Sequence, residues 1–229
     1  MYIDPLYIIL VMPAVILAFI AQIGVKTTFS KYSKVSPARR ITGEDAARAV
    51  LRANGVEGVR FEYVAGDLTD HFDPKTNTIR LSGSVGSASS IAAIGVAAHE
   101  AGHAVQHAKG YALIKFRMAI IPITNIGSML AFPLILIGIL IEMTALAYLG
   151  IAFFGFSTVF QLVTLPVELN ASKRAVQAIK NEGLLDGDEL KGAKKTLTAA
   201  AMTYLAALFV SVMQLLRLVL MVGGSRRRD

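Results

Sequence analysis

The stretch Val96-Ala-Ala-His-Glu-Ala-Gly-His-Ala-Val105 contains His99, Glu100 and His103 in the order His-Glu-x-x-His. On an α-helix, positions i and i+4 share one face and lie about 6 Å apart along the axis. Two imidazoles at that spacing can bind one zinc ion, and the glutamate beside the first can act on a water bound to the metal. The stretch therefore predicts a helix that carries a metal site, for which the rest of the chain must provide a third ligand.

The composition is typical of a membrane protein. Of the 229 residues, 54% are hydrophobic and only 17% are charged, and such a balance favours segments that cross a bilayer. The net charge of +7 fits the flanks of membrane spans and surface loops. Because no basic soluble domain with aromatic platforms is present, we expect no nucleic-acid partner. The absence of cysteine excludes disulfides, thiolate metal ligands and a nucleophilic cysteine.

Apolar stretches predict a mainly α membrane protein with about four transmembrane helices. Residues 5–25 are long enough to cross a bilayer and are read as a retained N-terminal anchor. Residues 118–165 are nearly uncharged and suit two spans, so they predict a helical hairpin with Glu142 at its tip. Residues 197–223 predict a C-terminal membrane helix, although Arg217 interrupts its apolar character.

The charges around the first apolar stretch predict its orientation. Asp4 precedes the stretch, and several basic residues follow it, beginning with Lys26 and Lys31. Because cytoplasmic flanks carry the excess of Lys and Arg, the N-terminus is expected outside and residue 26 onward in the cytoplasm. Residues 41–116 and 166–196, which have soluble character, are then expected on the cytoplasmic side.

Residues 41–116 predict a small α+β unit of zincin type, built on the His-Glu-x-x-His helix. Thr42-Gly-Glu-Asp45 resembles a capping box, which opens a helix. Residues 59–64 and 78–82 alternate between apolar and polar and predict two strands separated by a turn-rich loop. Residues 87–109 predict the helix with the metal site, and a substrate strand could pair with residues 78–82.

His107 repeats the four-residue step after His103 and is the first candidate for a third ligand. It lies about 12 Å along the helix axis from His99, which is too far for both to bind one ion with bonds of about 2 Å. No glycine between His103 and His107 breaks the helix. We therefore interpret His107 as a polar residue near the helix end.

The acidic candidates lie downstream and are sorted by membrane topology. A ligand must lie on the same side of the membrane as His99, so an even number of spans must separate the two. Glu142 at the hairpin tip fails this condition, whereas Glu168, two spans away, fulfils it. The alternative for Glu168 is a surface glutamate at the N-terminus of a helix that begins at Pro166. Asp186 is a further alternative, but its polar neighbours are typical of a solvated helix cap.

Three motifs together resemble the YugP-type neutral zinc metallopeptidases of prokaryotic membranes: Leu68-Thr-Asp-His-Phe-Asp-Pro74, the stretch at 96–105, and Leu165-Pro-Val-Glu-Leu-Asn-Ala-Ser-Lys-Arg-Ala175. The resemblance covers nearly the whole chain. It implies a multi-pass membrane peptidase of gluzincin type, distantly similar to the HtpX and CAAX-protease group.

By position, the resemblance implies that His99, His103 and Glu168 bind one Zn²⁺ and that Glu100 is the catalytic glutamate. In the HtpX-like group an aspartate four residues after the ligand glutamate orients a ligand histidine. This chain has Ser172 there, which can accept a hydrogen bond but carries no charge.

The expected reaction is hydrolysis of peptide bonds in a peptide or membrane-protein substrate at the lipid bilayer. Glu100 takes the proton from the zinc-bound water and passes it to the leaving amine. His71 or Tyr111 could stabilise the oxyanion, and the alternative for His71 is a loop histidine bonded to Asp70 or Asp73.

Two other functions are open. The chain could be a membrane scaffold or transporter with a structural or lost metal site, which would not need Glu100. It could also be a site-2-type intramembrane protease that uses Asp186. The sequence leaves an oligomer or an accessory partner open.

Overall fold

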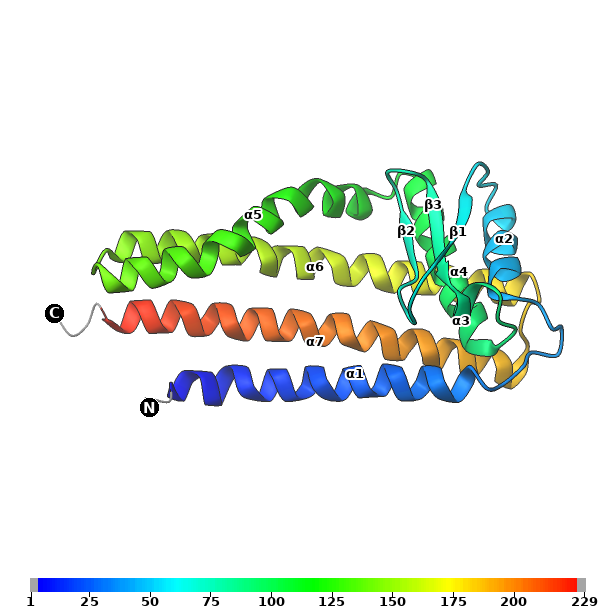
Figure 1. The fold of residues 1–229 in the computed structure, drawn as a ribbon, viewed down its shortest axis with the longest axis horizontal. Helices are drawn as coiled ribbons and strands as arrows, with labels where there is room; N and C mark the ends of the chain where they lie inside the picture. The colour runs from blue at the N-terminus through cyan, green and yellow to red at the C-terminus, as the bar shows by residue number, and fades with distance from the viewer. Residues whose placement is uncertain (1–3, 226–229) are drawn as a thin grey trace. The chain divides into compact units, whose positions relative to one another are not determined.

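The computed structural model describes residues 4–225 of the chain. The fold is mainly helical and includes one small sheet of three strands (Figure 1). In chain order the elements are η1 (Tyr7–Val11), α1 (Met12–Tyr32), α2 (Gly43–Ala53), β1 (Arg60–Val64), β2 (His71–Asp73), β3 (Thr78–Ser82), α3 (Gly83–Gly86), α4 (Ile91–Ala108), α5 (Ala112–Leu140), α6 (Thr144–Asn181) and α7 (Gly187–Ser225).

These elements form two compact units. Unit 1 comprises the described part of Met1–Ala21, Lys115–Pro166 and Thr203–Asp229, and unit 2 comprises Gln22–Ile114 and Val167–Met202. Helices α1, α6 and α7 each contribute residues to both units. The His-Glu-x-x-His motif belongs to unit 2, so the candidate site can be described within that unit alone.

The sheet of unit 2 has the strand order β1-β3-β2. Strand β1 runs parallel to β3, with Phe61 opposite Ile79, and β2 runs antiparallel, with Phe72 opposite Ile79. Both predicted strands are present, but β2 lies where we expected only a loop, because three residues are too few to show an alternating pattern. Since β3 has a partner on each side, the prediction that a substrate strand pairs with residues 78–82 is wrong.

Helix α4 is central to unit 2 and packs against α2, β2 and β3. The predicted capping box at the start of α2 is confirmed: the Thr42 hydroxyl accepts from Asp45 N, and Asp45 accepts from Thr42 N. Helix α4 begins at Ile91, inside the predicted span 87–109. Ser87 and Ser90 were the two possible caps, and the structure has Ser90, whose hydroxyl accepts from Ala93 N. Its apolar side chains join those of α2 and β3 in one buried core.

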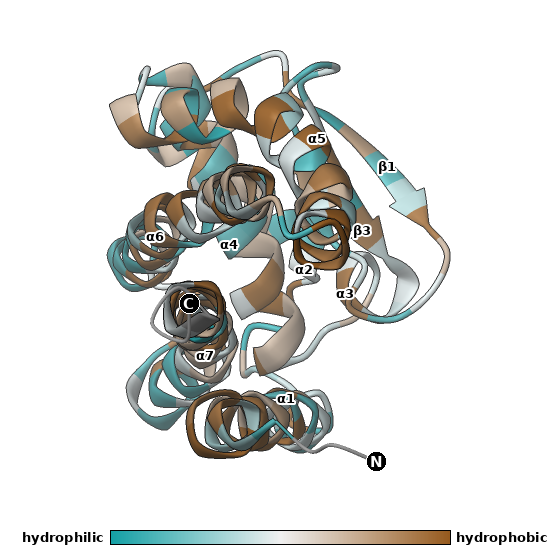
Figure 2. Ribbon diagram, turned by 90° about the vertical axis from the view of Figure 1, so that its left-hand side faces the viewer, coloured by the Kyte–Doolittle hydropathy of each residue, from teal (hydrophilic) through white to brown (hydrophobic). Residues whose placement is uncertain are grey.

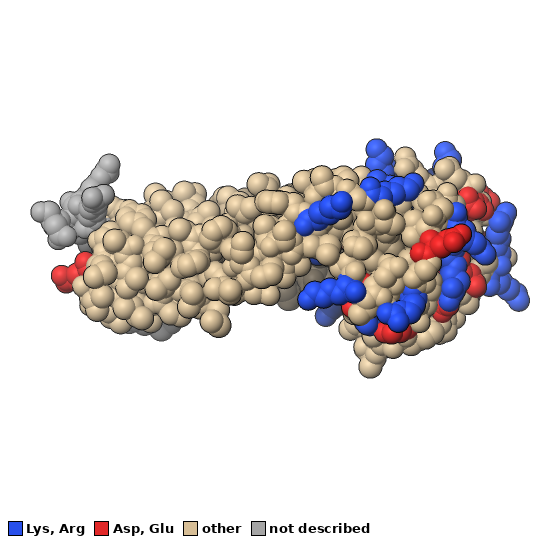
Figure 3. All heavy atoms as spheres, turned by 90° about the horizontal axis from the view of Figure 1, so that it is seen from above, with Lys and Arg blue, Asp and Glu red and all other residues tan. Residues whose placement is uncertain are grey.

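The four helices that the sequence predicted as spans are long and apolar enough to cross a membrane: Tyr7–Tyr32, Ala112–Leu140, Thr144–Asn181 and Gly187–Gly224. The prediction of about four membrane helices is confirmed by length and composition. Figure 2 colours the helix labelled α1 largely brown, for hydrophobic residues, and β1 partly teal, for hydrophilic ones. On the face seen in Figure 3, lysine, arginine and acidic side chains gather over unit 2.

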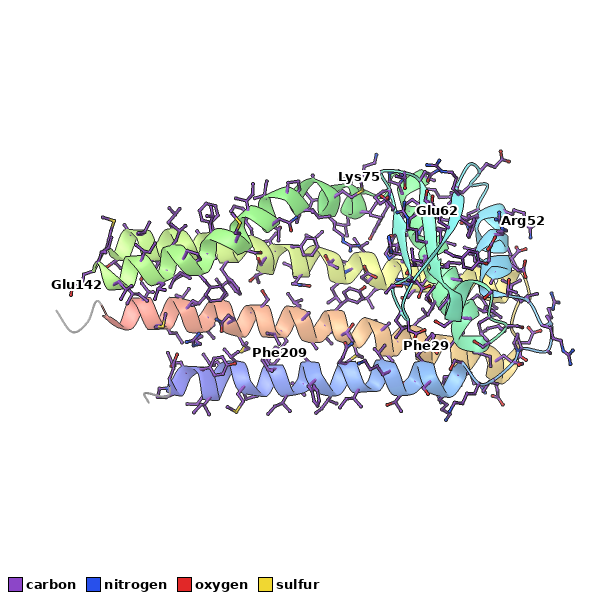
Figure 4. All side chains as sticks on the ribbon, in the orientation of Figure 1. Phe29, Arg52, Glu62, Lys75, Glu142 and Phe209 are labelled. Carbon is purple, nitrogen blue, oxygen red and sulfur yellow. The ribbon has the colours of Figure 1, made fainter. Side chains whose placement is uncertain are left out.

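Unit 1 contains the predicted hairpin. Helices α5 and α6 are joined by a short turn at Glu142, which has a φ of 58° and lies at the tip (Figure 4). Arg217, which interrupts the apolar character of α7, donates to the Asp4 carboxylate over 2.7 Å. A charged side chain in an apolar segment is stabilised when an opposite charge neutralises it, so this pair explains how α7 accommodates an arginine.

Two helices continue where we expected boundaries. The helix expected to begin at Pro166 begins at Thr144, and Pro166 lies inside α6. Helix α7 likewise runs through Thr196 without interruption. In both places the composition changes from apolar to polar while the backbone stays helical, so the change of hydropathy was mistaken for a helix end.

Candidate metal centre

Three side chains of unit 2 converge on one point. The Nε2 atom of His99 lies 3.1 Å from Oε2 of Glu168, and the Nε2 atom of His103 lies 3.3 Å from the same oxygen. One ligand-type atom from each residue lies within 4.8 Å of the other two. His103 and Glu168 are buried and His99 is nearly so. This group has the composition and spacing of a metal site with two imidazoles and one carboxylate.

Helix α4 positions the two histidines one turn apart, with their rings edge to face and 4.7 Å between the centroids. Helix α6 brings Glu168 to them because α4 offers a glycine at the contact. A Cβ atom on Gly102 would lie only 2.7 Å from the carbonyl oxygen of Ala171. Glycine costs a helix about 1 kcal/mol relative to alanine, and here it permits the two backbones to approach.

Gln106 fixes the orientation of His103. Its Nε2 donates to the backbone oxygen of Val167 over 2.9 Å and to Oδ1 of Asn170 over 3.0 Å. Its Oε1 therefore faces Nδ1 of His103, 3.0 Å away. Because an amide oxygen only accepts, Nδ1 of His103 must carry the proton, and in the neutral imidazole Nε2 then presents its lone pair to Glu168.

A side chain of α6 contacts the ring of His99 and can fix its orientation. The hydroxyl of Ser172 lies 3.1 Å from Nδ1 of His99. Ser172 occupies the position for which the resemblance to the HtpX-like group implies an aspartate. A hydroxyl can accept from Nδ1–H and leave Nε2 free for a metal. Both histidines thus have a polar neighbour at Nδ1 and direct Nε2 toward the same carboxylate oxygen.

The donor set fits a bound cation. When His103 is neutral, the lone pair on its Nε2 faces a carboxylate oxygen that can only accept, so the two repel unless a proton or metal ion lies between them. Burial lowers the pKa of His103. The hydrogen bond to Glu168 and the negative charge of Glu168 raise this pKa by more, so the net shift is upward. The group therefore attracts positive charge, and a divalent ion with nitrogen and oxygen ligands satisfies it.

Glu100 belongs to the same helix but not to the converging group. It is buried, and its Oε2 accepts from the backbone N–H of Phe72 on β2 over 3.0 Å. Asp70 lies near it and accepts from Ser82 N over 2.7 Å. Burial raises the pKa of Asp70 despite this hydrogen bond, and the charge of Glu100 adds to the rise. Strand β2 thus holds the glutamate beside the candidate metal ligands.

The other candidates lie outside the group. His71 is exposed and its Nδ1 bonds to the Thr69 oxygen at 2.8 Å. His107 packs its ring 5.7 Å from that of Phe72. Tyr111 is half-buried, and Asp186 is exposed just before α7. None of these four is among the residues that converge with His99 in the described part of the chain.

Sequence reasoning missed Gln106 and Asn170. Gln106 follows His103 by three residues, which places both on one helix face, and that spacing is a signal that could have identified it. Its partner, the backbone oxygen of Val167, could not be foreseen, because the two residues are 61 positions apart in the chain.

Comparisons with known proteins agree with this chemistry. Residues 7–223 match a family model described as "Putative neutral zinc metallopeptidase". A curated Bacillus subtilis (strain 168) protein named "Putative membrane protease YugP" is 46% identical over 221 residues, which cover 96% of this chain and 98% of that protein. No solved structure matches the chain.

Proposed function

This chain belongs to the family described as "Putative neutral zinc metallopeptidase", and from this premise we propose that it is a zinc metalloendopeptidase of a prokaryotic cell membrane. The observation that carries the proposal is the convergence of His99, His103 and Glu168 on one buried point. We assign these three residues as the ligands of one Zn²⁺ in a gluzincin-type, zincin-like unit. When bound there, zinc lowers the pKa of a water toward 7 and polarises a carbonyl group.

We assign Glu100 as the general base. It follows His99 directly, and the Phe72 N–H holds its carboxylate. In this role Glu100 takes the proton of the attacking water and passes it to the leaving amine. Gln106 and Ser172 are positioning residues in this proposal, because they hold the Nδ1 atoms of His103 and His99. His71 and Tyr111 remain only predicted oxyanion stabilisers.

The substrate strand is proposed to lie along β2 in place of β3. Strand β3 is paired on both sides, whereas β2 is an edge strand. The Phe72 N–H points to Glu100 rather than to β3, so the open edge of β2 faces the proposed base. An extended peptide that pairs with this edge would bring its backbone to Glu100 and the proposed ligands.

Unit 2 is proposed to face the cytoplasm, because basic residues follow the first apolar span while Asp4 precedes it. Reporter fusions after residues 45 and 142 test this. We expect the reporter at 45 inside and the reporter at 142 outside. If both lie on one side, Glu168 cannot reach His99 by the proposed topology.

The decisive test of the reaction is Glu100→Gln in the purified full chain, assayed with a fluorogenic peptide library and by metal analysis. We expect one zinc per chain to remain and the hydrolysis rate to fall roughly 10²- to 10⁴-fold. The matched control is Glu182→Gln, an exposed glutamate that should leave both unchanged. Stoichiometric zinc together with equal hydrolysis by wild type and Glu100→Gln would favour a structural metal site in a scaffold or transporter.

The third ligand is tested by comparing Glu168→Ala with Asp186→Ala. We expect Glu168→Ala to lose most of its zinc and Asp186→Ala to retain it. The opposite result would favour the site-2-type protease that uses Asp186.

A further inference from the structure

Four lysines line one cavity of unit 2, and none of the residues that line it belongs to the candidate metal centre. The cavity has a volume of about 570 Å³ and lies between the end of α1 and the start of α7. Lys31 comes from α1, and Lys191, Lys194 and Lys195 come from α7. From this cavity we propose a binding site for the phosphate headgroup of an anionic phospholipid.

The positive charge of the cavity is largely uncompensated. Asp188 forms an ion pair with Lys191 over 2.8 Å. Among the described residues Lys31, Lys194 and Lys195 form no ion pair, and Lys31 instead lies 5.6 Å from the ring centroid of Tyr32. Lysine is a strong point charge for phosphate, so several lysines that share one cavity attract an anionic group.

The remaining lining suits a phosphate ester. Thr27, Thr28, Thr198 and Tyr32 provide hydroxyl groups that can donate to phosphate oxygens. Tyr32 is held in place because its ring packs against Gly192, where a Cβ atom would lie 2.8 Å from the ring. The junction of α1 and α7 is therefore close-packed beneath the cavity, and the hydroxyl of Tyr32 has a fixed support.

The position along both helices favours a lipid over a soluble anion. The lysines lie at the polar ends of α1 and α7, both of which are candidate membrane spans. On the other side the lining becomes apolar with Ala199 and Met202, and Met202 is 48% exposed. A headgroup among the lysines would place its acyl chains along these apolar residues. Basic pockets at the cytoplasmic ends of membrane helices bind anionic headgroups in this way.

The test uses the purified full chain in neutral detergent, titrated with phosphatidylglycerol, phosphatidylcholine or soluble glycerol 3-phosphate. Bound lipid is counted by native mass spectrometry, and the melting temperature is recorded in parallel. We expect phosphatidylglycerol to bind and to raise the melting temperature with concentration. Phosphatidylcholine and glycerol 3-phosphate should do neither at equal concentration, and added salt should weaken phosphatidylglycerol binding.

The variant Lys194→Gln/Lys195→Gln should weaken phosphatidylglycerol binding roughly 10- to 30-fold. The matched control Lys75→Gln/Lys180→Gln removes the same charge from exposed positions outside the cavity and should bind as the wild type does. Lys194→Arg/Lys195→Arg should retain most of the affinity, which shows that the glutamine variant loses charge and not fold.

Three outcomes would overturn the proposal. An equal loss in the control variant would indicate general surface charge. Equal binding of phosphatidylcholine would indicate an apolar groove without headgroup recognition. Equal binding of glycerol 3-phosphate would indicate a site for a soluble phosphate. None of these results bears on the peptidase activity, so the two proposals fail independently.

Discussion

In unit 2, Ile79, Ile94 and Ile179 are completely buried, whereas in unit 1 Met129 and Leu140 expose 70% and 72% of their surface. Burial of apolar area in water stabilises a core by about 25 cal/mol per Å², and unit 2 has such a core. Apolar side chains that face outward give no such gain in water but suit a lipid environment. Unit 2 thus has a core of the kind that stabilises a fold in water, whereas the exposed apolar side chains of unit 1 fit the proposed membrane location.

Both units nevertheless use glycine for close helix contacts. A Cβ atom on Gly150 of unit 1 would lie 2.6 Å from the Ala131 oxygen, much as Gly102 of unit 2 approaches Ala171. In lipid, close backbone packing is a main source of helix association. In unit 2 the close contact at Gly102 brings the proposed ligands on α4 and α6 together. Substitutions at these glycines should therefore affect different properties in the two units.

Among the substitutions that test this comparison of the two units, Gly102→Ala should have the largest effect. The added methyl group would push α4 away from α6 and separate the histidines from Glu168. A misplacement of about 1 Å can reduce a reaction rate roughly 10²-fold, so we expect peptidase activity to fall by that factor and zinc content to drop.

The control for Gly102→Ala is Gly95→Ala in the same helix, where a Cβ atom would lie 3.5 Å from Ala193, an ordinary contact. It should keep both activity and zinc. Full activity in Gly102→Ala would show that the contact does not position the site.

Gln106→Ala should have the next largest effect. Without its amide, Nδ1 of His103 loses its acceptor and the tautomer is no longer fixed, so zinc affinity should fall roughly 10- to 100-fold. Competition with a chelator measures the affinity. The control is Gln177→Ala, an exposed glutamine on α6, which should bind zinc as the wild type does. Unchanged affinity in Gln106→Ala would remove Gln106 from the positioning residues.

Gly150→Ala tests unit 1 alone. Overpacking at this contact should lower the free energy of unfolding by about 1–3 kcal/mol, measured by denaturation in detergent micelles. Zinc affinity of the folded protein should stay the same. The control is Gly155→Ala, where no atom lies within 4 Å of the added Cβ. If zinc binding falls with stability, the two units do not act separately.

The smallest effect is expected for Thr42→Ala, which removes the cap of α2. It should lower the free energy of unfolding by about 1 kcal/mol at neutral pH. The hydrogen bonds from Thr42 lower the pKa of Asp45 below its ordinary value of 3.8. This stabilisation is present above that value and is lost as the pH falls through the folded-state pKa.

The difference between wild type and Thr42→Ala should therefore shrink in acid. Thermal unfolding at pH 7 and at pH values below about 4 measures it. A difference that stays constant over this range would contradict the role of Asp45 in the cap.

Local patterns predicted much of this fold. The capping box at Thr42, the strands β1 and β3 and the four apolar helices follow from spacing and hydropathy alone. Strand β2 could not be predicted, because its three residues are extended only through their pairing with β3. The continuity of α6 through Pro166 was missed for a different reason: hydropathy reports the environment of a helix and not where it ends.

The candidate site was predictable in part. The motif identified the two histidines, and counting spans pointed to Glu168, which the structure brings to them; their role as ligands stays a prediction. The hydrogen bond between Gln106 and His103 could not be predicted from the sequence, because the orientation of Gln106 depends on a backbone carbonyl of another helix.

The proposed ligands are far apart in the chain, since His103 and Glu168 are 65 positions apart. The whole α5–α6 turn lies between them. During synthesis, a chain that ends between residues 103 and 168 contains the histidine motif but not Glu168, so its proposed ligand set is incomplete. If the proposed assignment holds, a nascent or truncated chain cannot hydrolyse neighbouring proteins. Hydrolytic activity begins only after the α5–α6 turn and Glu168 have been synthesised.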